Sequence, residues 1–374
     1  MQIKRVIHDA VKKSLFKGKV VIIYGARQVG KTTLVKEILK DYPKNSEYFN
    51  CDEIDIRQAI TDKTSTELKV FFAGKKLVIL DEAQRVKNIG LTLKIIVDNF
   101  PDIQIIATGS SSFDLSNEIS EPLTGRKFEF YLQPFSLQEL KSIYSELEFK
   151  RLLERRIIYG MYPDVVLKEE DAEINLKTLV LSYTYKDILQ YQNIKSPEVL
   201  EKLLQALALQ VGNEVSYNEL AVLVGIDKNT VSNYIQILEK AFIIFRLSPF
   251  SRNLRNELKK LRKIYFYDLG LRNAIINNFN PLSLRQDVGA LWENFMISER
   301  VKRNNNLGIF ANIFFWRVTS GKEIDYIEDS GGVLSGYEFK WQKDSFSVPK
   351  EFLSAYPKSS IKLINNKNYL DFLL

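Results

Sequence analysis

The segment from Gly25 to Thr32 constrains this chain more than any other. Its residues, Gly-Ala-Arg-Gln-Val-Gly-Lys-Thr, match the pattern G-x-x-x-x-G-K-[ST] without deviation. The apolar run Val20 to Tyr24 comes directly before it, and a helical pattern from Lys31 to about Lys40 comes directly after it. A strand, a glycine-containing loop and a helix in this order predict the first βα unit of an α/β domain.

The loop residues fit the binding of a nucleotide phosphate chain. Glycines such as Gly25 and Gly30 let successive backbone N–H groups and a helix N-terminus face phosphate oxygens. Lys31 then reaches the β- and γ-phosphates, and the Thr32 hydroxyl binds Mg²⁺. The pattern therefore predicts ATP and Mg²⁺ as cofactors, held by the loop residues Gly25, Arg27, Gly30, Lys31, Thr32 and Thr33.

A hydrolysing site also needs acids at the end of a neighbouring strand. The run Leu77 to Leu80 has strand length and leads into Asp81 and Glu82. We expect Asp81 to complete the Mg²⁺ site and Glu82 to polarise the attacking water as general base. The alternative is a solvated pair of acids at the end of a strand.

Two further polar positions are candidates for this site. Thr108 and Ser110 follow the apolar run Ile103 to Ala107, where a hydroxyl could sense the γ-phosphate, although such residues also form ordinary turns. Arg126 precedes the expected strand Phe128 to Leu132. It is either an arginine finger for a neighbouring subunit's nucleotide or a surface arginine.

Charge and composition exclude several classes of protein. The 53 basic and 46 acidic residues give a formal net charge of +7, which predicts an anionic partner without naming it. His8 and Cys51 are the single histidine and cysteine. These counts exclude an internal disulfide, a cysteine-based zinc site, and histidine catalysis away from the N-terminal helix. The single cysteine fits a reducing cytoplasm. No apolar run approaches 18 residues, so we expect no membrane span.

Alternation of short apolar runs with helical stretches over the first 133 residues predicts a parallel sheet. A helical pattern from Ser136 to Tyr159 and another from Glu173 to Gln192 follow. Beyond Pro197 come three helical patterns with short joints, and then strands alternate with helices to the C-terminus. The expected fold class is therefore α/β.

Two of those three helices have the spacing of a helix-turn-helix. Ala221, Gly225 and Val231 stand at A-x3-G-x5-V, and the second helix presents a polar face. The following segment 251–263 contains six basic residues and one acid, which favours salt-dependent binding to DNA phosphates. The alternatives are a helix-turn-helix used only for packing or oligomer contacts, and a solvated basic run.

Carboxylates near the C-terminus form an Asp-x12-Glu-x-Lys pattern. A turn at Ser330-Gly331-Gly332 would bring Asp325 and Glu338 to one edge of a two-stranded hairpin, where they could hold Mg²⁺. Lys340 lies two residues beyond Glu338 and therefore on the same face of the strand. Glu293, on the preceding helix, could be a further acid of this metal site.

These segments together resemble the large prokaryotic family of AAA-type ATP-binding proteins. The residues that carry the resemblance are the loop and strand-end motifs above, Gln133-Pro134-Phe135-Ser136, and the segments 159–163, 263–271 and 291–340. The resemblance implies an AAA core, a helical lid, a winged helix and a nuclease-like PD-(D/E)xK domain. In the last, Ile324 replaces the family's proline, which leaves nuclease activity open.

From this resemblance we expect a P-loop core at 1–133, a lid at 134–195, a winged helix at 196–250 and a nuclease-like domain at 251–374. Our main hypothesis is an ATPase that binds DNA and couples hydrolysis to moving along it, remodelling it or cutting it. An Arg126 finger would require a homo-oligomer, for which a ring is one arrangement. The second hypothesis is an ATP-dependent switch that grips a protein partner and cleaves nothing.

Overall fold

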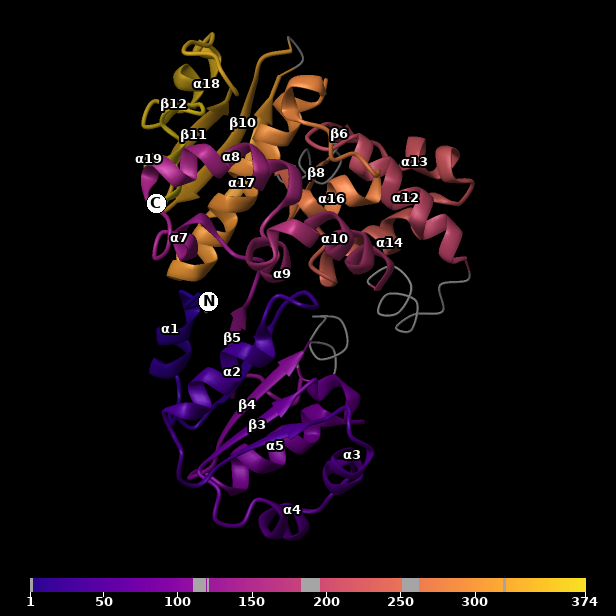
Figure 1. Ribbon diagram of the computed structural model, residues 1–374, viewed down its shortest axis with the longest axis vertical. Helices are drawn as coiled ribbons and strands as arrows, with labels where there is room; N and C mark the ends of the chain where they lie inside the picture. The colour runs from indigo at the N-terminus through magenta and orange to yellow at the C-terminus, as the bar shows by residue number, and fades with distance from the viewer. Residues whose placement is uncertain (1–2, 110–118, 120, 183–195, 251–261, 319–320) are drawn as a thin grey trace. The chain divides into compact units, whose positions relative to one another are not determined.

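A computed structural model of the chain describes residues 3–109, 119, 121–182, 196–250, 262–318 and 321–374 (Figure 1). The chain divides into two compact units. We call residues up to 134, with 240–242, the N-terminal unit, and residues 135–239 and 243–374 the C-terminal unit. Each unit has its own sheet, of five strands in the first and seven in the second.

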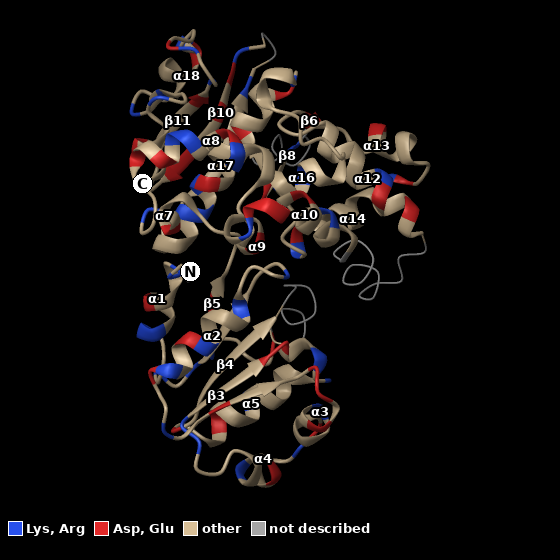
Figure 2. Cartoon of the chain, viewed as in Figure 1, with Lys and Arg blue, Asp and Glu red and all other residues tan. Residues whose placement is uncertain are grey.

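The sheet of the N-terminal unit is parallel, with strand order β2-β3-β4-β1-β5. β1, β3 and β4 are buried along their whole length, and Figure 2 draws β3 and β4 mainly in tan. Strands covered on both faces have continuous apolar runs, which is why these were visible in the sequence. The prediction of a parallel α/β core is confirmed. The strands are β1 (Val20–Tyr24), β2 (Ser46–Asn50), β3 (Leu77–Asp81), β4 (Gln104–Gly109) and β5 (Lys127–Tyr131).

Helices connect these strands and cover the sheet. α2 packs on β2, β3 and β4, and α1 packs on α2, whereas α4 packs against α5. Right-handed crossovers place α2 on one face and the helices between β2 and β4 on the other, because the chain crosses the sheet in opposite directions (Figure 1). The helices are α1 (Ile7–Lys13), α2 (Lys31–Lys40), α3 (Ile54–Ile60), α4 (Ser65–Phe71) and α5 (Ile89–Asn99).

The C-terminal unit begins with short helices. Where the sequence predicted one helical stretch from Ser136 to Tyr159, the structure has two helices, because Ser136 and Ser145 each start a capping box. The prediction of a single stretch was wrong, although both S-x-x-E patterns are visible in the sequence. The described helices of this part are α7 (Leu137–Leu140), α8 (Glu146–Tyr159), α9 (Pro163–Leu167) and α10 (Ala172–Ser182).

A helix-turn-helix follows, made of α13 (Tyr217–Val224) and α14 (Lys228–Lys240), with α12 (Pro197–Leu209) before it. Gly225 ends α13 with φ 74°, a left-handed conformation that favours glycine. Val231 is fully buried, as the spacing requires. The pair β7 (Ile244–Pro249) and β8 (Arg262–Phe266) comes next, and β8 also pairs with β6 (Glu214–Val215).

These three strands belong to the same sheet as the C-terminal strands. The order is β12-β11-β10-β9-β7-β8-β6, and β7 joins β9 in parallel. The sheet thus continues across residue 250, and the boundaries expected inside the C-terminal unit stay predictions. The remaining elements are α16 (Leu269–Ile275), α17 (Val288–Leu307), β9 (Asn312–Arg317), β10 (Glu323–Ser330), β11 (Val333–Phe339), α18 (Lys350–Ala355), β12 (Ser360–Ile364) and α19 (Tyr369–Leu373).

The end of α8 is locked onto the start of α16. The buried Asp268 carboxylate accepts the Leu271 N–H at 3.0 Å and the Met161 N–H at 2.7 Å. A Cβ on Gly270 would lie 2.0 Å from the carbonyl oxygen of Tyr159. The segments 159–163 and 263–271, which carry part of the family resemblance, therefore form one tightly packed junction.

Among the described residues, no helix combines the length and apolar character needed to cross a membrane.

Candidate functional site

The loop between β1 and α2 lies at the carboxyl edge of the N-terminal sheet. Gly25 admits no side chain, because a Cβ there would lie 2.1 Å from the carbonyl oxygen of Leu132. Gly30 has φ 94° and precedes the first residue of α2. The buried Lys31 ammonium donates to the carbonyl oxygens of Gly25 and Ala26, each at 2.9 Å. The backbone thus has the curled form that the glycine spacing predicts.

Three hydroxyl groups converge on the buried carboxylate of Asp81. Oδ2 accepts from Thr32 Oγ1 at 2.7 Å and from the Tyr48 hydroxyl at 2.6 Å, and Oδ1 accepts from Thr108 Oγ1. Because β4 lies between β1 and β3, Thr108 stands next to Asp81 at the carboxyl edge. The structure therefore brings together Thr32, Asp81 and Thr108, which the sequence selected separately.

Glu82 follows Asp81 with a left-handed backbone, φ 54°. Its N–H donates to Thr108 Oγ1 at 3.1 Å, and its Oε2 accepts from Gln84 Nε2 at 2.6 Å. Thr108 thus contacts both acids, and Gln84 orients the carboxylate of Glu82. Sequence reasoning missed the roles of Gln84 and Tyr48.

Arg5 is a further residue that sequence reasoning missed. Its buried guanidinium donates from Nη1 to the Val29 carbonyl oxygen at 2.7 Å and from Nη2 to the Gln133 carbonyl oxygen at 2.5 Å. It thereby holds the peptide group of Val29 in the loop. A lone arginine in an N-terminal helical pattern gives no signal for such a contact.

The remaining predicted nucleotide ligands differ in position. Arg27 is half-buried in the loop and Thr33 is exposed on α2, whereas Ser110 lies outside the described residues. Arg126 lies at the amino edge of the sheet, since its carbonyl oxygen accepts the Val20 N–H, and its Nε is 2.7 Å from Asp98 Oδ1. A finger role towards a neighbouring subunit stays a prediction and requires that this exposed ion pair open.

The C-terminal acids meet on the hairpin of β10 and β11. Tyr326 pairs with Tyr337, and Asp325 and Glu338 are the residues next to this pair on the two strands. Lys340 Nζ lies 2.6 Å from Glu338 Oε1 and 4.0 Å from Asp325 Oδ2, and the Phe339 N–H donates to Asp325 Oδ2 at 2.8 Å. Glu338 Oε2 is buried and has no hydrogen-bond partner among the residues that the structure describes.

Burial makes these acids unusual. It raises the pKa of Asp325 well above its ordinary value, and the nearby Glu293 and Glu338 carboxylates raise it further. The pKa of Glu338 is also raised, first by burial. Burial opposes the charge of Lys340, but Asp325 and Glu338 raise its pKa overall. The site therefore contains more carboxyl groups than lysines, and this crowding favours a proton on Asp325.

One predicted role needs correction. Lys263 belongs to the basic segment 251–263, which the sequence predicts to bind DNA phosphates. Residues 251–261 of this segment lie outside the described residues, and the side chain of Lys263 is only 4% exposed. Its Nζ lies 3.0 Å from Glu293 Oε1, which also accepts from the Tyr265 hydroxyl at 2.5 Å. With its side chain buried and paired in this way, Lys263 does not face a DNA backbone.

Glu293 is therefore already paired, and its role as a metal ligand stays a prediction. Within the parts of the chain that the structure describes, no three His, Cys, Asp or Glu side chains are grouped so that they could hold a metal ion. Any cation at the hairpin would rely mainly on Asp325 and Glu338, as well as on backbone oxygens.

The helix-turn-helix presents a polar face on α14. Lys228, Asn229, Asn233 and Gln236 are exposed there. Asp227 starts this helix by accepting the N–H groups of Asn229 and Thr230 at 2.8 and 3.1 Å. Residues 197–242 are acidic overall, with six acids against three bases (Glu198, Glu201, Glu214, Glu219, Asp227 and Glu239; Lys202, Lys228 and Lys240).

Three family models match successive parts of the chain. Residues 17–141 match a family described as an AAA domain. Residues 150–282 match a domain of unknown function (DUF8612), and residues 288–370 match another (DUF4143). The AAA-domain match covers the part of the chain that contains the loop Gly25 to Gly30 and the acids Asp81 and Glu82.

Related proteins match over most of their length. An uncharacterized protein of Methanocaldococcus jannaschii is 24% identical over 94% of this chain and 89% of its own. An uncharacterized protein of Mycobacterium tuberculosis is 24% identical over 88% of this chain and 72% of its own. The Pif1 helicase from Candida albicans is 15% identical, with a TM-score of 0.28 over 48% of each chain.

Proposed function

We propose that this chain hydrolyses ATP with Mg²⁺ at the carboxyl edge of the N-terminal sheet. The observation that carries the proposal is the Asp81 carboxylate, which the hydroxyls of Thr32 and Thr108 contact directly beside the loop Gly25 to Gly30. Mg²⁺ prefers oxygen ligands and keeps few protein ones, and a hydroxyl and a carboxylate 2.7 Å apart fit that preference. Thr32 and Asp81 would hold the ion, which would supply positive charge to offset the charge of the phosphates.

The chain's own residues would divide the remaining work. The Lys31 ammonium now donates to the carbonyl oxygens of Gly25 and Ala26. With ATP bound, it would donate to the β- and γ-phosphate oxygens instead. Glu82 would take a proton from the attacking water. Thr108 and Gln84 hold Glu82 in place for that step. Ser110 and Arg27 remain proposed phosphate ligands.

We further propose that hydrolysis is coupled to an action on DNA. The helix-turn-helix of α13 and α14 supports this, since its second helix offers exposed amide groups of Asn229, Asn233 and Gln236 to a groove. The basic composition of 251–262 would supply phosphate contacts. An oligomer, with Arg126 acting on a neighbour's nucleotide, belongs to this proposal.

This coupling predicts that DNA stimulates ATP hydrolysis. We expect the steady-state ATPase rate of the wild type to rise severalfold with single-stranded, duplex or branched DNA, and the rise to fall steeply between 50 and about 200 mM salt. Asn233→Ala combined with Gln236→Ala should lose most of the stimulation while keeping the basal rate. A basal rate that no DNA form changes at any salt concentration rules out the coupling.

A second candidate function is an ATP-dependent switch that binds a protein partner. The acidic balance of residues 197–242 favours it, because such a surface repels DNA phosphates. Val222 and Leu223 on α13 also have 85% and 64% of their surface exposed. Loss of DNA stimulation with intact hydrolysis would favour this switch.

For the C-terminal unit we propose a divalent cation site at Asp325 and Glu338. Glu338 Oε2 is buried and has no hydrogen-bond partner within the described part of the chain, which fits such a ligand, and so does the excess of carboxylates over lysines. Lys340 would stabilise charge beside it. DNA cutting at this site would show that the action on DNA is cleavage and not movement along DNA or its remodelling.

The cation site predicts a thermal shift and a nicking activity that depend on the same residue. In the Lys31→Ala background, Mn²⁺ should raise the unfolding temperature of the C-terminal unit by a few degrees, and Asp325→Ala should abolish that rise. Supercoiled plasmid should be nicked with Mn²⁺ unless Asp325 or Lys340 is replaced by alanine. Asp329→Ala, on the same strand, serves as control. An identical Mn²⁺ shift in Asp325→Ala would contradict the site.

A further inference from the structure

We infer that Tyr48 is a positioning residue for Mg²⁺ at the nucleotide site, because its hydroxyl holds the carboxylate of Asp81. This inference rests on the proposed function, since it assigns a task within the proposed ATP site. Tyr48 lies on β2, which is separate in sequence from the loop and from the acids that the sequence pattern selects. It acts through Asp81 and is not a catalytic residue.

Strand register explains how Tyr48 reaches the site. Tyr48 pairs with Ile79 on β3, and Asp81 lies two residues beyond Ile79 on the same face of that strand. The long side chain of tyrosine spans this offset, so that its hydroxyl lies 2.6 Å from Asp81 Oδ2. A phenylalanine at this position would fill the same space without reaching the carboxylate.

The hydrogen-bond count at Asp81 gives Tyr48 its importance. Thr32 and Tyr48 both donate to Oδ2, and Thr108 donates to Oδ1. If the Thr32 oxygen becomes a metal ligand, Tyr48 and Thr108 are the side chains that still fix the plane of the carboxylate, one on each oxygen. Removal of a partner that orients a metal-binding group typically lowers metal affinity or activity ten- to a hundredfold.

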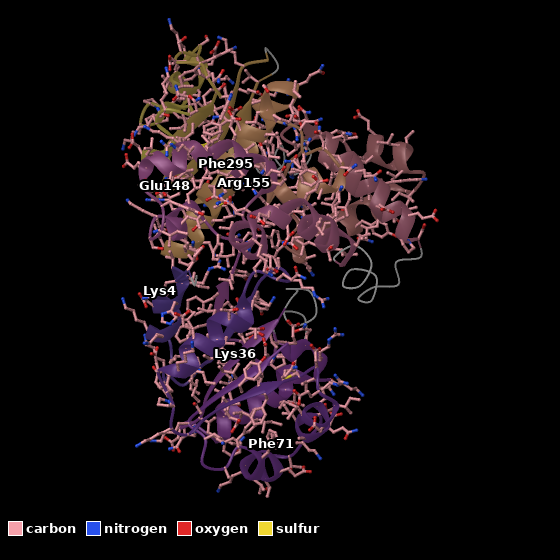
Figure 3. All side chains as sticks on the ribbon, in the orientation of Figure 1. Lys4, Lys36, Phe71, Glu148, Arg155 and Phe295 are labelled. Atoms are coloured by element: carbon pink, nitrogen blue, oxygen red, sulfur yellow. The ribbon has the colours of Figure 1, made fainter. Side chains whose placement is uncertain are left out.

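The Tyr48 side chain is a phenol, whose O–H group donates to Asp81 Oδ2. Lys36 lies on α2 and is labelled in Figure 3. Its ammonium is 4.6 Å from the centre of the Tyr48 ring. Tyr48→Phe preserves this ring contact and removes only the hydrogen bond to Asp81.

The test is nucleotide binding and not turnover. A fluorescent ATP analogue is titrated in the Glu82→Gln background, once in EDTA and once over a range of Mg²⁺ concentrations. Tyr48→Phe should raise the half-saturating Mg²⁺ concentration about tenfold and leave the affinity in EDTA within about twofold. Tyr42→Phe, whose ring packs on Phe16 in the same unit, should change neither value.

The outcomes separate this inference from the function on which it rests. An unchanged Mg²⁺ dependence in Tyr48→Phe overturns the inference and leaves the ATP site standing. An equal loss of affinity in EDTA and in Mg²⁺ also overturns it, since the residue would then support the loop and not the metal-holding acid. If the Glu82→Gln chain binds no nucleotide, the proposed function fails and this inference falls with it.

Discussion

Glu82→Gln is expected to slow ATP hydrolysis at least about a hundredfold while ATP binding persists. General-base catalysis contributes about 10²- to 10⁴-fold, and glutamine keeps the shape of glutamate without its proton affinity. The Gln84 amide and the Thr108 hydroxyl hold this position in the structure, so the substituted side chain should remain in place. Binding of a fluorescent ATP analogue and release of phosphate are measured on the same preparation.

The matched control is Glu37→Gln on α2, which removes one carboxylate from the same unit outside the site. It should hydrolyse ATP at the wild-type rate. If Glu82→Gln retains more than about a tenth of that rate, Glu82 is not the base. Asp81 or a water held by Thr108 would then be the next candidate.

The second large effect is expected from Gly270→Ala. The added Cβ would lie 2.0 Å from the Tyr159 carbonyl oxygen, a backbone atom that cannot rotate away. Overpacking of this kind costs about 1–3 kcal/mol and occasionally more. We expect a loss of at least about 2 kcal/mol, equivalent to a fall of roughly 4–8 °C in the unfolding temperature of the C-terminal unit.

Tryptophan fluorescence reports on this unit alone, because the three tryptophans are Trp292, Trp316 and Trp341. Gly289→Ala is the control, since a Cβ there meets nothing within 4 Å and alanine favours the helix α17. It should leave the transition unchanged or raise it slightly. Equal transitions for Gly270→Ala and the wild type would show that the junction of α8 and α16 yields easily.

Local patterns predicted the elements around the nucleotide site well. The loop motif and α2, which runs from Lys31 to Lys40, follow from glycine spacing and helical periodicity. The turn at Gly225 follows in the same way from the requirement for a left-handed residue. Such features depend on residues close in sequence, so one chain suffices to find them.

Features that depend on strand order and register were missed. The contact of Tyr48 with Asp81 requires β2 to pair with β3 in one particular register, which the composition of these strands does not specify. Lys263 looked like one more charge in a basic run. Its side chain is buried, and Glu293, thirty residues further on, neutralises it. Sequence counts of charge cannot distinguish a paired interior lysine from a surface one.

The most direct test of the central claim is phosphate release from ATP by the wild type, Lys31→Ala and Lys40→Ala. Lys40 is exposed at the end of the helix that Lys31 begins, so it controls for the loss of one positive charge. We predict equal Mg²⁺-dependent rates for the wild type and Lys40→Ala, and a rate at least about a hundredfold lower for Lys31→Ala. Phosphate release that is as fast in Lys31→Ala as in the wild type would contradict the account.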